Sequence, residues 1–217
     1  LVDKEHKPGG HWNHAYPFVT LHQPSAFYGV SSKELSRGVI DKVGLNQGLN
    51  ELASGAQINA YYCDLMHEAF LPSGRVFYFP RCEHLGDGVI RSLVTGETIQ
   101  LGYQKLVDAT YYKTSIPATH TPAFHVDQGV NFIPPNKLPF LAAPIKGVTI
   151  IGGGKTAIDS CLWLLEHGVP ANNIMWVMPR DGWFIDRKNT QPSADFFFDS
   201  IGAQASQMEA IAESTSM

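Results

Sequence analysis

The strongest structural signal in the chain lies in Val148-Thr149-Ile150-Ile151-Gly152-Gly153-Gly154-Lys155-Thr156-Ala157-Ile158-Asp159. Its glycines follow the pattern G-x-G-x-x-A, which is the fingerprint of a dinucleotide-binding βαβ unit. Gly152 allows the tight turn, Gly154 the close approach of a pyrophosphate, and Ala157 the close packing of a helix on a strand. The helix that begins with Lys155 and Thr156 offers backbone N–H groups and a partial positive charge to phosphates.

The residues on both sides of this turn complete the pattern. Val148–Ile151 is a β-branched apolar run, typical of a parallel strand that is buried on both faces. Apolar residues then recur at i, i+3, i+4 and i+7 and predict the buried face of a helix, formed by Ile158, Cys161, Leu162 and Leu165. Gly168 and Pro170 supply a helix stop, and residues 174–178 are expected to form the second strand.

Arg180 lies just past this second strand and bears on the choice of nucleotide. An acidic residue near this position accepts hydrogen bonds from the ribose of NAD, whereas an arginine suits the 2′-phosphate of NADP. Asp181 follows directly and keeps the NAD alternative open. We predict NADP as the preferred cofactor.

The residues Gly153-Gly154-Lys155-Thr156 also resemble the end of a Walker A loop, G-x-x-x-x-G-K-[ST]. That pattern requires a glycine at position 149, where this chain has Thr149. The strand also runs up to Gly152 and leaves no room for a long phosphate loop. Hydrolysis of nucleoside triphosphates is therefore not expected.

The composition is that of an ordinary soluble globular protein. Over 217 residues, a hydrophobic content of 44% allows a sizeable core in one large domain or two small ones. A net charge of -4 and the lack of a basic run argue against a nucleic-acid or anionic-membrane partner. No apolar stretch reaches the length of a membrane span, and no signal peptide opens the chain.

The cysteines are scattered at Cys63, Cys82 and Cys161, without a C-x-x-C pair. They indicate reduced, mostly buried thiols in a cytoplasmic protein and count against a dithiol–disulfide oxidoreductase. His11 and His14 lack cysteine or carboxylate partners at ligand spacing, so no metal site is expected. Ser25 and Ser160 lack the nucleophile-elbow context of a serine hydrolase.

Both ends of the sequence suggest a piece of a larger protein. Leu1-Val2-Asp3 has the pattern of the tail of a strand, and no initiator methionine precedes it. The sequence stops at Met217 within a helical pattern. We therefore expect a fragment of a longer chain.

The part of the chain before the glycine turn predicts mixed structure. A helix is expected over 49–70, a strand over 75–80 and another short strand over 105–109. Residues 89–94 and 99–103 flank Thr95-Gly96-Glu97-Thr98 and predict an antiparallel β hairpin. Residues 114–139 are irregular and rich in proline, which indicates a crossover between two lobes, and the nucleotide-binding unit begins near Lys146.

The N-terminal residues supply a second set of motifs. Val2-Asp3-Lys4 is followed by Pro8-Gly9-Gly10-His11-Trp12, then by Tyr16-Pro17 and by Leu21-His22-Gln23-Pro24-Ser25-Ala26-Phe27-Tyr28. With the later glycine turn and Arg180, this order resembles the flavin-containing and Baeyer–Villiger-type monooxygenases, just after their first glycine motif. The resemblance covers residues 1–30 and 100–187 well and the middle only in outline.

This resemblance implies an α/β fold with two Rossmann-like dinucleotide-binding lobes, both incomplete. Residues 1–140 would form a partial FAD-binding domain, and residues 141–217 a partial NAD(P)-binding domain. Asp3 would accept hydrogen bonds from the adenosine ribose of FAD, as a carboxylate at a strand end does. The other FAD contacts that the resemblance implies are Gly9, Gly10, Trp12, His22, Gln23, Ser25 and Thr110. The alternatives are a solvated acid at Asp3, core packing at Trp12 and a structural histidine at His22.

The sequence also departs from the family pattern. The first glycine motif, which would hold the FAD pyrophosphate, is missing, and Tyr111 stands where the family's A-T-G segment has glycine. The Baeyer–Villiger hallmark F-x-G-x-x-x-H is absent before the second glycine motif. The match is closer to uncharacterised bacterial flavoproteins of the same superfamily.

The resemblance implies an FAD-dependent oxidoreductase that uses NADPH to reduce flavin and inserts oxygen into a small organic substrate. No residue is assigned as a catalytic acid or base. A flavin-dependent NAD(P)H reductase without oxygen insertion is the first alternative, and a non-enzymatic dinucleotide-binding module is the second. The sequence indicates neither the substrate nor an oligomeric state.

Overall fold

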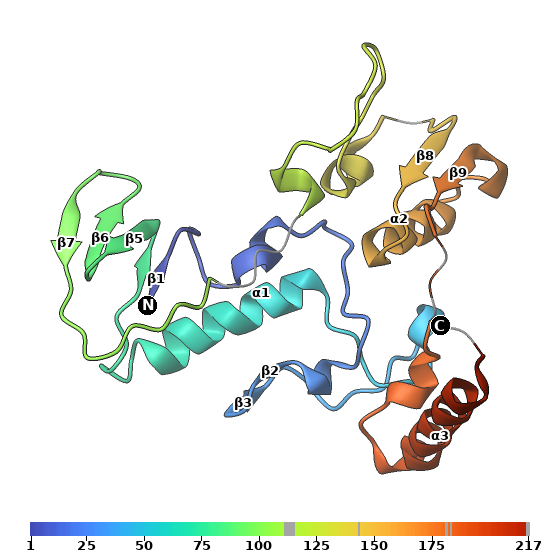
Figure 1. Ribbon diagram of the computed structural model, residues 1–217, viewed down its shortest axis with the longest axis horizontal. Helices are drawn as coiled ribbons and strands as arrows, with labels where there is room; N and C mark the ends of the chain where they lie inside the picture. Colours follow the sequence, from blue (N-terminus) through green and yellow to red (C-terminus); the bar gives the residue numbers. More distant parts are fainter. Residues whose placement is uncertain (111–115, 143, 181, 183, 216–217) are drawn as a thin grey trace. The chain divides into compact units, whose positions relative to one another are not determined.

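The computed structural model describes residues 1–110, 116–142, 144–180, 182 and 184–215 and has mixed α/β structure (Figure 1). The strands are β1 (Val2–Asp3), β2 (Gly29–Val30), β3 (Lys33–Glu34), β4 (Phe79–Pro80), β5 (Cys82–Gly86), β6 (Val89–Ser92), β7 (Thr98–Gln100), β8 (Val148–Ile151) and β9 (Ile174–Val177). The helices are α1 (Gly55–Asp64), which continues as a π-helix over Leu65–Phe70, α2 (Lys155–Glu166) and α3 (Phe197–Glu213). The α/β class expected from the sequence is confirmed.

The chain divides into two compact units. Unit 1 comprises Leu1–Pro17 and Ala56–Phe140, and unit 2 comprises Phe18–Gly55 and Leu141–Met217. One division falls between residues 140 and 141, where the sequence predicted a domain boundary, but residues 18–55 group with the C-terminal residues. The assignment of each part to a dinucleotide stays a prediction.

Unit 1 contains a parallel pair and an antiparallel sheet. Strand β1 pairs with β4, which places Asp3 opposite Pro80, and β5, β6 and β7 follow one another in a second sheet. The predicted hairpin is confirmed, because β6 and β7 are antiparallel and Ser92 N donates to Glu97 O at 2.9 Å across the turn. The predicted strand over 105–109 is wrong. No strand pairs with this segment in the described structure, and Val107 is 83% exposed.

The helix expected over 49–70 begins only at Gly55. The residues before it form isolated bridges instead, Thr20 with Ser54 and Ile40 with Asn50, so their backbone groups are used outside a helix. A Cβ added at Gly55 would lie 2.6 Å from Val19 Cγ1, which explains a glycine at the helix start. From there the helix reaches Phe70 and buries four side chains, Ile58, Tyr61, Leu65 and Met66.

The β8–α2–β9 segment of unit 2 has the expected order of strand, helix and parallel strand (Figure 1). Val148 lies opposite Ile174, and Ile151 lies opposite Val177. The helix stop is confirmed at Gly168, whose φ is +81°. Val169 N donates to Leu164 O at 3.0 Å, which closes the turn in the manner of a Schellman motif.

The predicted buried face of α2 is wrong by one position. Its buried residues are Ala157, Ser160 and Leu164, while Leu162 and Leu165 are exposed. Small side chains at 157 and 160 let the helix approach the sheet closely, and Ser160 Oγ donates a hydrogen bond to Thr156 O at 2.8 Å. The polar residue Ser160 therefore lies on the helix face that packs on the sheet. The spacing of apolar residues does not predict a serine at such a position.

The prediction that β8 is buried on both faces is also wrong. Ile150 is buried, whereas Ile151 is 55% exposed and Met175 on β9 is 63% exposed. Alternate residues of a strand point to opposite faces of a sheet. The face that carries Val148, Ile150, Ile174 and Trp176 is therefore the more buried one, and the other face is exposed in the described chain.

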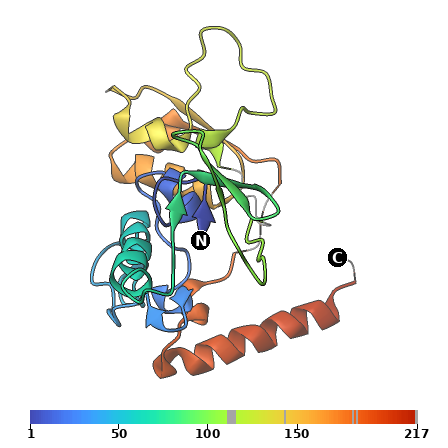
Figure 2. The same cartoon turned by 90° about the vertical axis from the view of Figure 1, so that its left-hand side faces the viewer.

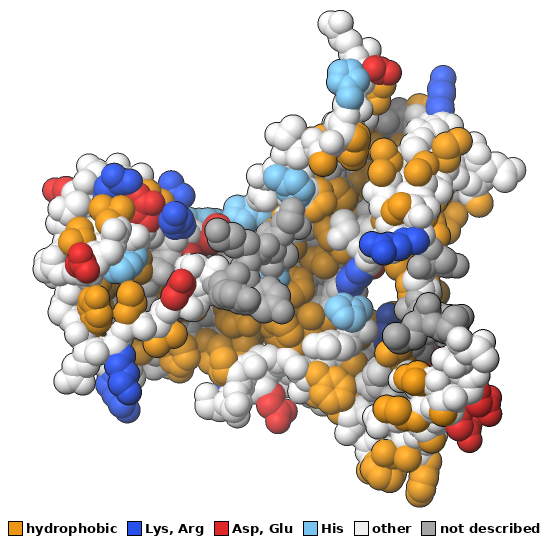
Figure 3. Space-filling view, viewed as in Figure 1, with side chains coloured by type: hydrophobic (Ala, Val, Ile, Leu, Met, Phe, Trp, Pro, Cys, Tyr) orange, Lys and Arg blue, Asp and Glu red, His pale blue; other side chains and the backbone are white. Residues whose placement is uncertain are grey.

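Helix α3 is seen along its length in Figure 2 and buries none of its side chains. Several apolar side chains of this region are visible at the surface in Figure 3, and Phe198 is 85% exposed. An ion pair of 3.3 Å joins Lys188 Nζ to Asp199 Oδ1 near the start of the helix. None of the helices in the described ranges is long and apolar enough to cross a membrane.

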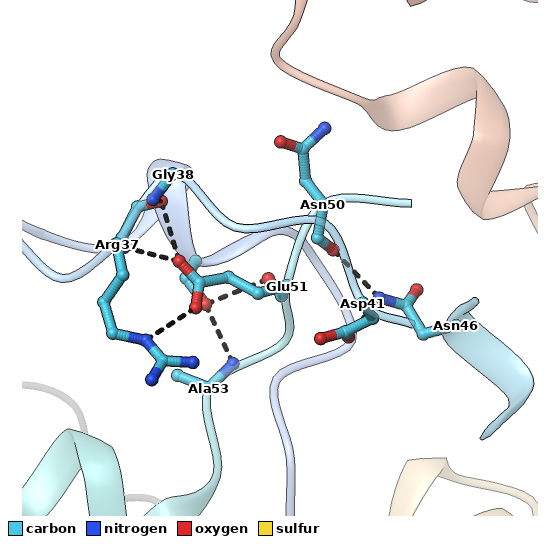
Figure 4. Close-up of polar contacts among 9 residues, drawn as sticks. Arg37, Gly38, Asp41, Asn46, Asn50, Glu51 and Ala53 are labelled. Carbon is cyan, nitrogen blue, oxygen red and sulfur yellow. Dashed lines mark hydrogen bonds and ion pairs between the residues drawn. The ribbon is translucent and has the colours of Figure 1, made fainter. Parts of the chain in front are cut away.

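A buried carboxylate fixes the loop of unit 2 that precedes α1 (Figure 4). Glu51 is 5% exposed, and it accepts hydrogen bonds from Ser36 Oγ at 3.1 Å and from Arg37 Nε at 3.0 Å. The backbone N–H of Arg37 donates to the same carboxylate. Burial raises the pKa of Glu51, but the hydrogen bonds and the positive charge of Arg37 outweigh it and leave the pKa below its ordinary value.

Amide side chains connect the same loop to a distant part of unit 2. Asn46 Nδ2 donates to Asp41 Oδ2 at 2.7 Å, and Arg187 Nη1 donates to Asn46 Oδ1 at 3.1 Å. Gln191 Oε1 accepts from both the backbone and the side-chain nitrogen of Asn50. These bonds hold residues 41–50 against residues 187–191, about 140 positions later in the chain.

We predict that Glu51 makes the stability of the protein depend on pH. Because its pKa is lower in the folded state, the carboxylate stabilises the fold above the ordinary value of 4.5, and this contribution is lost as the pH falls through the lower folded value. Glu51→Gln should lose about 1–3 kcal/mol at neutral pH and show a flatter decline below pH 4.5, measured by urea unfolding. Glu34→Gln, at an exposed position of β3, is the control, and equal behaviour of the two variants would contradict the prediction.

Candidate functional site

Gly152 connects β8 to α2 in a conformation that favours glycine. Its φ is +124°, and a Cβ added there would meet no atom within 4 Å, so the backbone rather than crowding selects glycine. Gly152 N donates to Val177 O at 2.9 Å and extends the parallel pairing by one bond. Gly152 O accepts a hydrogen bond from the indole Nε1 of Trp176 at 2.6 Å. Both polar groups of this glycine are thus held by β9.

The next two glycines differ in their surroundings. A Cβ added at Gly153 would lie 3.0 Å from Met178 Cγ and 3.4 Å from Arg180 O, so the residues that follow β9 pack against the turn. Gly154 is the N-cap of α2, has extended backbone and would meet nothing within 4 Å of an added Cβ. No side chain caps this helix end in the described structure. The turn is closed beside Gly153 and open over Gly152 and Gly154.

The first turn of α2 carries a charged pair. Lys155 is the first residue of the helix, and its Nζ forms an ion pair with Asp159 one turn later. The N-terminus of a helix has a partial positive charge, which disfavours a cation, and the carboxylate of Asp159 offsets this repulsion. Thr156 follows and uses its carbonyl oxygen to accept from Ser160. The turn therefore combines backbone donors with a lysine held in place.

The sequence-predicted NADP residues come together at this turn. Gly152, Gly154, Lys155 and Thr156 all lie within residues 152–156 at the helix start, and the carbonyl of Arg180 lies near Gly153. Arg180 itself is exposed. Asp181, which kept the NAD alternative open, lies outside the described residues. The spacing predicted this grouping, whereas Trp176 was missed because no motif contains it.

A hollow of about 580 Å³ lies at the other end of the same βαβ unit. It is lined by Lys146, by His167 and Gly168 at the end of α2, and by Asn173 just before β9. Ligands of parallel α/β sheets bind beyond the carboxyl ends of the strands. Because the hollow lies at the amino ends of β8 and β9, we take the glycine turn as the candidate site.

The predicted FAD residues of unit 1 lie near its N-terminal strand. Asp3 ends β1, and its Oδ1 accepts from Glu5 N at 3.0 Å. Gly9 and Gly10 both have positive φ, as expected for a glycine turn. A Cβ added at Gly9 would lie 2.5 Å from Asn59 Oδ1, whereas one at Gly10 would meet nothing within 4 Å. The space that a Cβ at Gly9 would need is therefore occupied by a side chain of α1.

Asn59 also fixes the residues that follow these glycines. Its Nδ2 donates to Trp12 O at 3.1 Å, within the short 3-10 helix Gly10–His14. The rings of His11 and Trp12 lie 5.3 Å apart, and burial lowers the pKa of His11. Sequence reasoning missed Asn59, since it lies far along the chain on a helix surface and belongs to no motif.

The remaining predicted FAD residues have different surroundings. Ser25 is buried in unit 2, where its Oγ donates to Glu51 O at 3.0 Å and accepts from Ala53 N at 2.8 Å. His22 is exposed and Gln23 half-buried in the same unit. Thr110 is exposed in unit 1, where its N and Oγ1 both donate to Asp108 Oδ1, and Tyr111 lies outside the described residues. These residues and those around Asp3 belong to two units, and a flavin contact for each stays a prediction.

Tyr78 is a half-buried residue that the sequence did not indicate, and the charge of Asp3 acts on its hydroxyl. Its hydroxyl is inaccessible and has no hydrogen-bond partner among the described residues. Burial, together with the negative charges of Asp3, Cys63 and Glu5, raises the pKa of Tyr78 to about 12. The phenol is therefore neutral at physiological pH.

Curated mycobacterial proteins are similar to this chain over its whole length. Uncharacterized protein Rv2000 of Mycobacterium tuberculosis and uncharacterized protein Mb2023 of Mycobacterium bovis are each 46% identical to it over 219 residues. The match covers 100% of this chain and 40% of each relative, so the chain spans two fifths of their length. No family model matches the chain. No solved structure matches it.

The glycine turn allows a matched pair of substitutions. Gly152→Ala should destabilise the protein by about 1–2 kcal/mol, because a residue with a Cβ is strained at a φ of +124°. Gly154→Ala should cost less, about 0.5 kcal/mol, because Gly154 has ordinary φ and open space around it, so only the preference of a helix N-cap for glycine over alanine is lost. Urea unfolding of the two variants measures the difference. Equal destabilisation would show that the turn does not have this conformation.

Proposed function

We propose that this chain is part of an FAD-dependent oxidoreductase that uses NADPH, and that the enzyme is a monooxygenase acting on a small organic substrate. The β8–α2–β9 segment would be its NADPH-binding unit. The observation that carries the proposal is the left-handed turn at Gly152, which opens at the carboxyl end of β8 onto an uncapped helix N-terminus. Backbone donors in that arrangement suit a pyrophosphate.

The residues around the turn fit an NADP molecule. The open space over Gly152 and Gly154 admits phosphate oxygens close to the backbone. Lys155 lies at the same helix start, where its Nζ is paired with Asp159. Arg180 follows β9, the position from which an arginine binds a 2′-phosphate. These residues would bind and orient the nucleotide, which would lie over Gly152 and Gly154.

The fit to FAD is less direct. Asp3 ends a strand that lies in a parallel pair, and Gly10 has open space and positive φ, both suited to a nucleotide. The Asn59 side chain occupies the space beside Gly9, and the glycine motif for the FAD pyrophosphate is not in this sequence. FAD binding is therefore supported mainly by the resemblance of the motifs to flavin-dependent monooxygenases.

Bound NADPH and FAD would supply the hydride transfer and the oxygen chemistry of such an enzyme, while the protein would bind and orient them. The residues of this chain would hold the nicotinamide nucleotide on the glycine turn and keep Asp3 at the ribose of FAD. No side chain of the described residues is assigned to proton transfer.

The first test of this proposal is spectroscopic. The full-length protein should be purified with a visible flavin absorption spectrum, and anaerobic NADPH should bleach that spectrum. A protein that carries no flavin and does not take it up would contradict the proposal. If NADPH reduces the flavin and electrons pass only to an added acceptor, without oxygen insertion into any product, the protein is a reductase and not a monooxygenase.

Arg180 provides the second test. Arg180→Ala should weaken NADPH binding by about tenfold or more and leave NADH binding nearly unchanged, since a charge-assisted bond to the 2′-phosphate contributes about 1.5–3 kcal/mol. Titration calorimetry with both nucleotides measures the two dissociation constants. Arg75→Ala, at an exposed position of unit 1, is the control. Equal loss of NADPH and NADH affinity would contradict an NADP-specific role.

A further inference from the structure

We infer that Trp176 is a positioning residue, whose indole N–H holds the glycine turn in the conformation that binds the dinucleotide. The inference rests on the proposed function, because it assigns a role toward the nucleotide of that same site. It does not follow from the glycine pattern, since Trp176 lies on β9, after the helix that the pattern opens.

The position of Trp176 in the sheet brings its side chain to the turn. Trp176 lies opposite Ile150 in the parallel register, and both belong to the more buried face of the β8–β9 pair. From there the indole Nε1 reaches forward to the carbonyl oxygen of Gly152, at 2.6 Å. The bond spans 24 positions of sequence and is partly buried, so water competes with it less than at the surface.

This bond fixes the peptide that joins Gly152 to Gly153. In a trans peptide the C=O and the N–H point in opposite directions. When Trp176 holds the Gly152 carbonyl, the N–H of Gly153 is therefore turned away from the indole. The preceding peptide is fixed as well, because Gly152 N donates to Val177 O at 2.9 Å. Two neighbours on β9 thus set both peptides around the glycine with the φ of +124°.

A glycine in this turn needs such a restraint. Glycine populates positive and negative φ about equally, so the sequence Gly152-Gly153-Gly154 has little conformational preference of its own. Ordering the turn only when the nucleotide binds would lower the affinity, and a turn ordered in advance avoids that cost. Phenylalanine at this position would keep an aromatic ring on the more buried face of the β8–β9 pair and would lack the N–H. Substitution by phenylalanine therefore tests the hydrogen bond separately from the bulk of the aromatic ring.

The test uses the full-length protein and the variant Trp176→Phe, which keeps an aromatic ring and removes the donor. We expect the dissociation constant for NADPH to rise about tenfold, as for the loss of one hydrogen bond, with flavin content unchanged and the melting temperature lowered by a few degrees. Trp163→Phe is the matched control. Trp163 lies on α2 and stacks on His167, with ring centroids 4.0 Å apart, away from the glycine turn.

A second measurement on the wild-type protein covers the case in which Trp176→Phe does not fold. The indole N–H resonance of Trp176, assigned by comparison with variants at the other tryptophans, should exchange slowly with solvent and shift when NADPH is added. Two results would overturn the inference, provided that NADPH binds the wild type. The first is unchanged NADPH affinity in a folded Trp176→Phe variant. The second is an indole N–H that exchanges rapidly with solvent and whose resonance does not shift when NADPH is added. If the wild type binds neither NADPH nor NADH, the proposed function itself fails.

Discussion

The conformation of Gly152 is the constraint on which the arrangement of the β8–α2–β9 segment depends. Its φ of +124° turns the chain sharply from the end of β8 into the first turn of α2. The neighbouring strand holds this turn through Val177 and Trp176, so the strand pairing and the turn support each other. The segment that follows β9 then lies against Gly153, which brings Arg180 to the same side of the unit as the start of the helix.

Close packing of α2 on the sheet follows from the same geometry. Ala157, Ser160 and Leu164 form the buried face of the helix, and the first two are small. The helix start therefore stays near the carboxyl ends of the strands, with its backbone donors beside the open space over Gly152 and Gly154. Elsewhere in unit 2, the buried carboxylate of Glu51 holds the loop before α1 together through Ser36 and Arg37. Bonds from Asn46 to Arg187 and from Asn50 to Gln191 join the same loop to residues 187–191.

Local features of the structure were predictable from the sequence, and contacts between distant residues were not. Strands β8 and β9, the stop at Gly168 and the β6–β7 hairpin depend on short patterns and turn residues, and they are confirmed. The late start of α1 was missed because it depends on bridges to residues 20 and 40, and the strand over 105–109 failed because no partner strand pairs with it in the described chain. At the candidate site, the glycine pattern predicted Gly152, Gly154 and Lys155, and the place after the second strand predicted Arg180; their contacts with a nucleotide stay a prediction. Trp176 and Asn59 were missed, since each acts across the fold on a backbone carbonyl.

The proposed function requires that the glycine turn bind the nucleotide. Amide hydrogen exchange of the full-length protein, followed with and without saturating NADPH, tests this most directly. We predict that NADPH slows exchange in the peptides that contain residues 148–159 and leaves exchange along α3 unchanged. Protection that is absent from residues 148–159, or confined to residues around the hollow at His167 and Asn173, would contradict it.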